Sequence, residues 1–286
     1  MLVLDDLPGT GGIPQWVLDN EAAGHTLDAY EPCPPPHHRA HGLVAVVVVV
    51  AAVLALWSGR PSSEPDAQVA ALAAEATMTQ VGQQLFYAHH PQVLDAAEFA
   101  GRCPARAVGC YSAGAGSIVV YEPEDERLHG WVVTVASHEM LHAAYDSLDD
   151  EDRRAVDALL DVTMAGLGVD DPLRAQVEAS VDGREDTRRT EQFAYIGSQV
   201  AGVDPRLEAF YGRFFDDRQA VVHAYTSTGS LLVALNADLA GQREVLKHLQ
   251  SQGRTSEAVA QRGVVDSLAQ DIGTLQTQMS GAVVSR

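Results

Sequence analysis

Apolar residues recur every three or four positions along most of the chain after residue 66, and this spacing predicts a series of amphipathic helices. The first is expected from Asp66 to about His89, where Pro91 restricts the residue before it. Further helices are expected over residues 151–167, from Pro172 to about Val181, around Glu191 to about Gly202, and from Pro205 onward. Ser117–Tyr121, bounded by glycines and Pro123, reads as a strand. The predicted fold class is mainly α with a small β element.

The C-terminal part, residues 226–286, carries apolar residues at heptad-like spacing. They are Leu232, Leu235, Leu239, Leu246 and Leu249 before Gly253, and Val265, Leu268, Ile272, Leu275 and Met279 after it. The break near Gly253 predicts two helices folded back as an antiparallel hairpin. An oligomerising coiled coil is the alternative, and either element suits binding of a protein partner.

Residues 43–57 form an unbroken apolar run, which as a helix extends about 22 Å. With Gly42, Ser58 and Gly59 added, it predicts a single transmembrane helix over residues 43–58, and a buried strand is the alternative. The other expected segments are a disordered acidic cytoplasmic tail at 1–42, a linker at 59–66, a catalytic domain at 67–225 and the C-terminal helices at 226–286.

Charge narrows the classes of function that the chain can have. The formal net charge is −20 over 286 residues, and Lys247 is the only lysine. Phosphate would be repelled by such a surface, so nucleic acid is not expected as a partner. The chain also lacks a glycine-rich phosphate-binding loop.

The chemistry is most evident at His138-Glu139-Met140-Leu141-His142, which spells H-E-x-x-H. On a helix the two histidines lie four residues apart on one face, where both imidazoles can reach one zinc ion. Glu139 then stands beside the site as a general base, because a carboxylate can take the proton of the water that zinc activates.

A catalytic zinc ion needs a third protein ligand, and the best candidate is Glu191 on a later predicted helix. Asp146, Asp149 and Asp150 are weaker candidates because they follow the motif too closely. Candidate donors to the transition state are Tyr195, Tyr211 and His223, for which core packing is the alternative role.

Cys103 and Cys110 flank a short loop that suits a disulfide in an oxidising compartment, although two free thiols or a zinc pair would also fit the spacing. Together with the apolar run, this pair predicts a cell-membrane protein with a cytoplasmic N-terminus and an extracytoplasmic catalytic domain. Arg39 and Arg60 flank the run almost symmetrically and decide little about orientation.

The motif, followed after a helical insertion by Glu191-Gln192-Phe193-Ala194, resembles the gluzincin type of zinc metallopeptidase. More narrowly, residues 85–218 are similar to poorly characterised membrane-tethered bacterial zincin-like proteins, which more often read Glu-Leu-His at the second segment. The resemblance implies a zincin-like domain, His138, His142 and Glu191 as zinc ligands, and Glu139 as the base. It also implies that an edge strand, suggested here at Ser117–Tyr121, holds the substrate backbone.

The sequence therefore predicts a membrane-anchored zinc metallopeptidase that hydrolyses peptide bonds in a peptide or protein substrate. The alternative is a membrane-tethered helical interaction or scaffold protein with a structural or vestigial zinc site. An intramembrane protease is disfavoured, because the motif lies about 80 residues beyond the apolar run.

Overall fold

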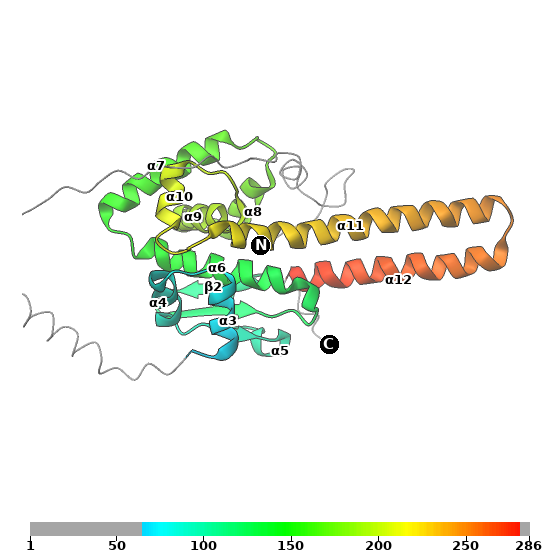
Figure 1. Ribbon diagram of the computed structural model, residues 1–286, viewed down its shortest axis with the longest axis horizontal. Helices are drawn as coiled ribbons and strands as arrows, with labels where there is room; N and C mark the ends of the chain where they lie inside the picture. The colour runs from blue at the N-terminus through cyan, green and yellow to red at the C-terminus, as the bar shows by residue number, and fades with distance from the viewer. Residues whose placement is uncertain (1–64, 281–286) are drawn as a thin grey trace, which may run out of the picture.

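The computed structural model describes residues 65–280. They form a mainly helical body with a small three-stranded sheet, and two long helices, α11 and α12, project from it side by side (Figure 1). The prediction of a mainly α fold with a small β element is therefore confirmed.

The membrane prediction is corrected. The expected span at residues 43–58 lies outside the described residues, as do the expected tail at 1–42 and most of the linker. Among residues 65–280, no helix combines the length and the apolar composition needed to cross a bilayer. The single-pass membrane location and the orientation inferred from it are therefore withdrawn.

The elements follow the order of the chain. They are α3 (Ala67–Glu75), α4 (Gln80–Ala88), β1 (Gln92–Leu94), α5 (Ala96–Phe99), β2 (Gly109–Ser112), β3 (Ser117–Tyr121), η1 (Glu126–Leu128), α6 (His129–Asp146), α7 (Asp150–Gly166), α8 (Pro172–Val181), η2 (Glu185–Thr187), α9 (Arg188–Gln199), α10 (Pro205–Tyr211), α11 (Arg218–Ser251) and α12 (Thr255–Met279). The helices expected over 151–167, from Pro172 and around Glu191 are confirmed as α7, α8 and α9.

Two predicted helices are interrupted. The helix expected from Asp66 to His89 divides into α3 and α4, because Thr77 adopts a left-handed backbone with φ of 51° and Thr79 caps the next helix with its hydroxyl. The stretch after Pro205 likewise ends at Tyr211, and Asp217 caps the start of α11. Both breaks depend on contacts between distant segments, such as the isolated bridge between Met78 and Phe215.

The sheet has the order β1-β3-β2, with β3 parallel to β1 and antiparallel to β2. The strand predicted at Ser117–Tyr121 is confirmed, but it is the central strand rather than an edge. β2 is an edge strand and lies against α6. The expectation that Ser117–Tyr121 is an edge strand that holds a substrate backbone is therefore wrong; β1 and β2 are the edges, and β2 is the one that lies beside the histidine motif.

Helix α6 runs through the middle of the body, between the sheet with α3 and α4 and the group α7 to α10 (Figure 1). Almost every side chain from Trp131 to Tyr145 is buried. A helix that is buried on nearly all sides belongs in a core, and here the apolar residues of α6 belong to the main core cluster, which fixes the helix that carries the two histidines.

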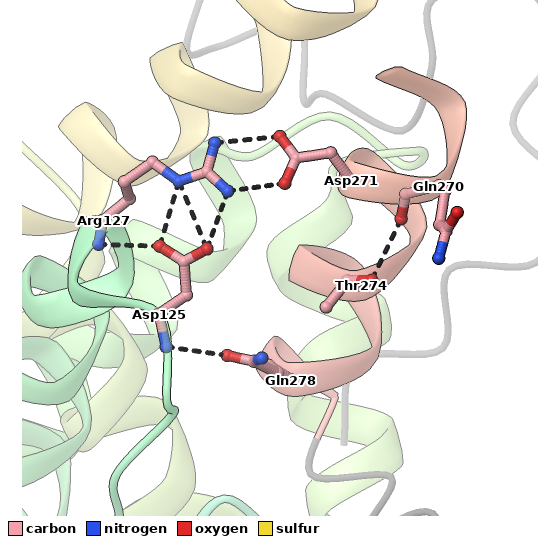
Figure 2. A network of polar contacts seen from close by, with 6 residues as sticks. All are labelled: Asp125, Arg127, Gln270, Asp271, Thr274 and Gln278. Carbon is pink, nitrogen blue, oxygen red and sulfur yellow. Dashed lines mark hydrogen bonds and ion pairs between the residues drawn. The ribbon is translucent and has the colours of Figure 1, made fainter. Parts of the chain in front are cut away.

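The α11–α12 hairpin turns at Gly253, which adopts a left-handed φ of 69°. Its seam is closed by Leu239, Val265 and Ile272. Figure 2 shows how its base is fixed to the body: the Arg127 guanidinium donates to both Asp125 and Asp271, at 2.7 Å to each from Nη2. α11 is continuous across the domain boundary predicted between residues 225 and 226. Its first turns pack in the main core, where Val221 is buried.

Candidate metal centre

Helix α6 brings the two histidines of the motif together. Because His138 and His142 are one turn apart, their Nε2 atoms lie 3.2 Å from each other. His142 is buried and His138 is mostly buried, with 9% and 13% of their side-chain surface exposed. Two imidazole nitrogens at this distance face the same small volume.

Helix α9 supplies the third group. Glu191 Oε2 lies 3.6 Å from His138 Nε2 and 3.8 Å from His142 Nε2. The carboxylate is also buried, and within residues 65–280 these three side chains are the one group of histidine, cysteine, aspartate or glutamate residues spaced to hold a metal ion. The predicted ligand set is thus brought together by two helices distant in sequence.

The three separations fit a small divalent metal ion. A point equidistant from the three atoms lies about 2.1 Å from each, which matches the usual zinc bond lengths of about 2.0–2.2 Å to nitrogen and oxygen. Two neutral imidazoles and one carboxylate are a ligand set found in catalytic zinc sites, where a fourth position stays open.

Neighbouring side chains orient the ligands. His142 Nδ1 lies 2.8 Å from Thr190 Oγ1, and an Nδ1–H that donates to this hydroxyl leaves Nε2 with a lone pair for the metal. The Tyr195 ring meets the His138 ring edge to face at 4.5 Å between centroids. Each imidazole is therefore held by a residue of α9.

The electrostatics of the metal-free site favour the forms that bind metal. Burial, followed by the nearby His138 charge, lowers the pKa of His142 to about 4, so that His142 is neutral at pH 7. Burial alone would raise the pKa of Glu191, but the hydrogen bond to His138 and the electrostatic interactions with the two imidazoles lower it below its ordinary value. A neutral imidazole and an ionised carboxylate are the states that a metal ion requires.

Glu139 lies beside this triad and is only 6% exposed. Burial, then the charge of Glu191, raises its pKa well above the ordinary value, while the backbone N–H of Tyr111 donates to the carboxylate and opposes that rise. A carboxylate with raised proton affinity can accept a proton from water near neutral pH, which suits the role of a general base.

A cleft of about 650 Å³ opens at the triad. The wall on one side is formed by β2 and the loop before it, the floor by α6, and the opposite wall by α8, η2 and α9. The Cys103–Cys110 disulfide predicted from the sequence is present and holds the loop against β2. The cleft is large enough for several residues of a peptide.

The other predicted site residues divide between the cleft and the rest of the body. Tyr195 lines the cleft, with its hydroxyl 2.7 Å from Ser180 Oγ. Tyr211 lies in the core behind α9 and donates to the Phe193 carbonyl, and His223 is exposed on α11. Tyr211 and His223 are therefore withdrawn as transition-state donors.

Asp146 lines the cleft without joining the triad, and Asp149 caps α7 through the N–H groups of Glu151 and Asp152. Sequence reasoning missed Thr190 and Tyr111, which both touch His142. Neither carries a motif. The proximity of Thr190 to Glu191 was the one available signal.

The comparisons with known proteins leave the chain without an assigned family. No family model matches it. No curated protein and no solved structure matches it either. The resemblance to gluzincins consequently rests on the motif, and the function must be argued from the site itself.

Proposed function

We propose that this protein is a zinc-dependent peptidase with a zincin-like arrangement of its site. The observation that carries the proposal is the meeting of His138, His142 and Glu191 at 3.2–3.8 Å, with Glu139 buried next to them. An ordinary amphipathic helix would turn such histidines to solvent, whereas here a second helix places a carboxylate within 4 Å of both imidazoles.

The three side chains would hold the metal ion, and a zinc ion bound there supplies Lewis acidity and lowers the pKa of a water molecule. Glu139 then has two tasks. Its carboxylate accepts the proton of the water that attacks the peptide carbonyl, and it returns that proton to the leaving amine. The raised pKa of Glu139 favours the first transfer, and the burial of its side chain limits its contact with bulk water.

Tyr195 is the candidate donor to the oxyanion. Its ring packs against His138 and its hydroxyl lies in the cleft wall near Ser180. A hydroxyl aimed at the developing negative charge stabilises the transition state more than the substrate. To donate to a substrate, the hydroxyl would exchange its hydrogen bond with Ser180 for one with the substrate, by rotation about the phenol C–O bond.

The substrate backbone is proposed to lie along β2. Tyr121 N–H donates to the Val108 carbonyl, so in this antiparallel pair the backbone groups of Gly109 and Tyr111 point away from β3. Tyr111 N–H is taken by Glu139, which leaves the Gly109 groups and the Tyr111 carbonyl for a peptide strand. Such pairing would place a peptide bond beside the base.

The test is a peptide-library digest of the full-length protein, read by mass spectrometry, with zinc content measured in the same samples. Glu139→Gln is expected to keep its zinc and to lose hydrolysis by about 10²–10⁴-fold. Glu98→Gln, on an exposed helix away from the cleft, is the matched control and should cleave as the wild type does. Full activity in Glu139→Gln would refute the assignment of the base.

The projecting α11–α12 hairpin favours one competing function, a helical interaction protein whose metal site is structural. The same digest separates the two. A wild-type protein that is fully loaded with zinc and cuts no peptide in a broad library would support the interaction protein and contradict the peptidase.

A further inference from the structure

Tyr111, on edge strand β2, contacts three different parts of the site. Its backbone N–H donates to the Glu139 carboxylate. Its ring lies nearly parallel to the His142 ring, with 8° between planes and 6.2 Å between centroids. Its hydroxyl donates to Asp146 Oδ2 at 3.1 Å. We propose that Tyr111 is a positioning residue that fixes the His142 imidazole for the metal ion, an inference that rests on the peptidase function proposed above.

The two sides of His142 are held by different elements. Thr190 of α9 engages Nδ1, and the Tyr111 ring of β2 lies nearly parallel to the imidazole as a neighbour on another side, with 6.2 Å between centroids. A histidine ring has one free torsion about its Cβ–Cγ bond, and contact with its face restricts that torsion while the hydrogen bond sets the tautomer. Without the Tyr111 ring, the Thr190 hydrogen bond would remain, but one of the two contacts that keep Nε2 facing Glu191 would be lost.

The Tyr111 ring is itself fixed at both ends. Asp146 follows His142 by one helical turn on α6, so the phenol hydroxyl is tied to the helix that bears the ligand. Behind it, the His89 ring meets the Tyr111 ring at 70° and 5.1 Å, and His89 Nδ1 lies 2.8 Å from the Leu85 carbonyl. The ring therefore cannot leave His142 without breaking contacts to α4 and α6.

The strand that carries Tyr111 is anchored independently of the metal ligands. Cys110, its neighbour, is joined by the disulfide to Cys103 and pairs with Val119 of β3. Because the strand proposed to bind substrate also presses on a ligand and donates to the base, a shift of β2 changes the metal affinity as well as the chemistry.

The experiment measures zinc affinity of the full-length protein by competition with a chromogenic chelator, together with the melting temperature of the metal-free protein. Tyr111→Ala is expected to weaken zinc binding by about 10–100-fold, the usual loss when a residue that orients a ligand is removed. Tyr111→Phe keeps the stacked ring and should lose less. Tyr87→Ala, which removes a half-buried tyrosine of α4 outside the cleft, should leave affinity unchanged.

The outcomes are distinct. The proposal is supported if Tyr111→Ala binds zinc more weakly than wild type and its metal-free form melts at a temperature no lower than that of Tyr87→Ala. Affinity within twofold of wild type in Tyr111→Ala overturns it and leaves the peptidase standing, whereas a wild type that binds no zinc overturns both. If Tyr111→Ala does not fold, Tyr111→Phe and Asp146→Asn decide: both must weaken zinc binding, and wild-type affinity in both overturns the proposal.

Discussion

Gly109 lies where β2 approaches α6, and the substitution Gly109→Ala tests that approach. A methyl group there would lie 2.6 Å from Val135 Cγ1 and 2.7 Å from Glu139 Oε1. Carbon atoms that are not bonded prefer separations of about 3.5–4.0 Å, so the strand or the helix would have to move by about 1 Å. Gly109 does not have a left-handed φ, and the effect would therefore be steric rather than conformational.

The magnitude follows from the crowding. Overfilling a packed region by one methyl group costs about 1–3 kcal/mol of folding free energy. A displacement of about 1 Å at the base would lower the rate of hydrolysis by about 10²-fold, because proton transfer depends on exact placement of the carboxylate. The methyl group contacts Glu139 and Val135 rather than any of the three ligands, so zinc binding should weaken only as far as the shift of β2 also moves Tyr111 away from His142.

The assay combines urea unfolding of the metal-free protein, zinc content and peptide hydrolysis for wild type, Gly109→Ala and Gly114→Ala. Gly114 lies in the turn between β2 and β3 with no atom within 4 Å of an added methyl group, so its substitution is the control and should change stability by less than about 0.5 kcal/mol. A Gly109→Ala protein as stable and as active as Gly114→Ala would refute the close approach of β2 to the base.

Three further predictions follow from the structure. Arg218, almost fully buried, donates to the Gly197 and Val200 carbonyls at the end of α9, so Arg218→Met should cost about 2–4 kcal/mol in urea unfolding. The exposed Arg206→Met should lose much less, and equal losses would contradict the role of Arg218. Replacing both Cys103 and Cys110 by serine opens a short loop and should cost about 2.5 kcal/mol by the loop-entropy relation, measured in the same way, and unchanged stability would argue against the disulfide. Zinc at about one hundred times its dissociation constant should stabilise wild type by about 2.7 kcal/mol in thermal unfolding, reversibly with a chelator, and should not stabilise Glu191→Ala; an equal rise in both would place the metal elsewhere.

Much of the site could be predicted from the sequence because its residues are local or carry a motif. His138, Glu139 and His142 lie within five consecutive residues of one helix, so their positions relative to one another follow from helix geometry alone. The position of Glu191 could not be derived in this way, because the sequence does not show which later helix packs against α6. The motif's need for a third ligand limited the candidates to later histidine, glutamate and aspartate residues. The disulfide could be predicted because its cysteines are close in sequence.

What could not be predicted depends on packing between distant segments. β2 is four residues long and has no alternating pattern, so the edge strand was placed at Ser117–Tyr121 instead. Tyrosine and histidine often donate to the transition state in zinc peptidases, so the residue types of Tyr211 and His223 alone could not exclude that role. The tertiary structure excludes it, because Tyr211 is buried in the core and His223 is exposed on α11. Tyr111 carries no motif, because its role arises from stacking across two elements.

The most direct test of the central claim is the zinc content of the purified full-length protein by elemental mass spectrometry, compared with His142→Ala and Glu191→Ala. The account predicts about one zinc ion per wild-type chain and loss of that zinc in both variants, since a site with two ligands binds far more weakly than one with three. Zinc retained in Glu191→Ala but lost in His142→Ala would assign the third ligand to another residue. A folded wild type without zinc, after dialysis against zinc, would contradict the metal centre itself.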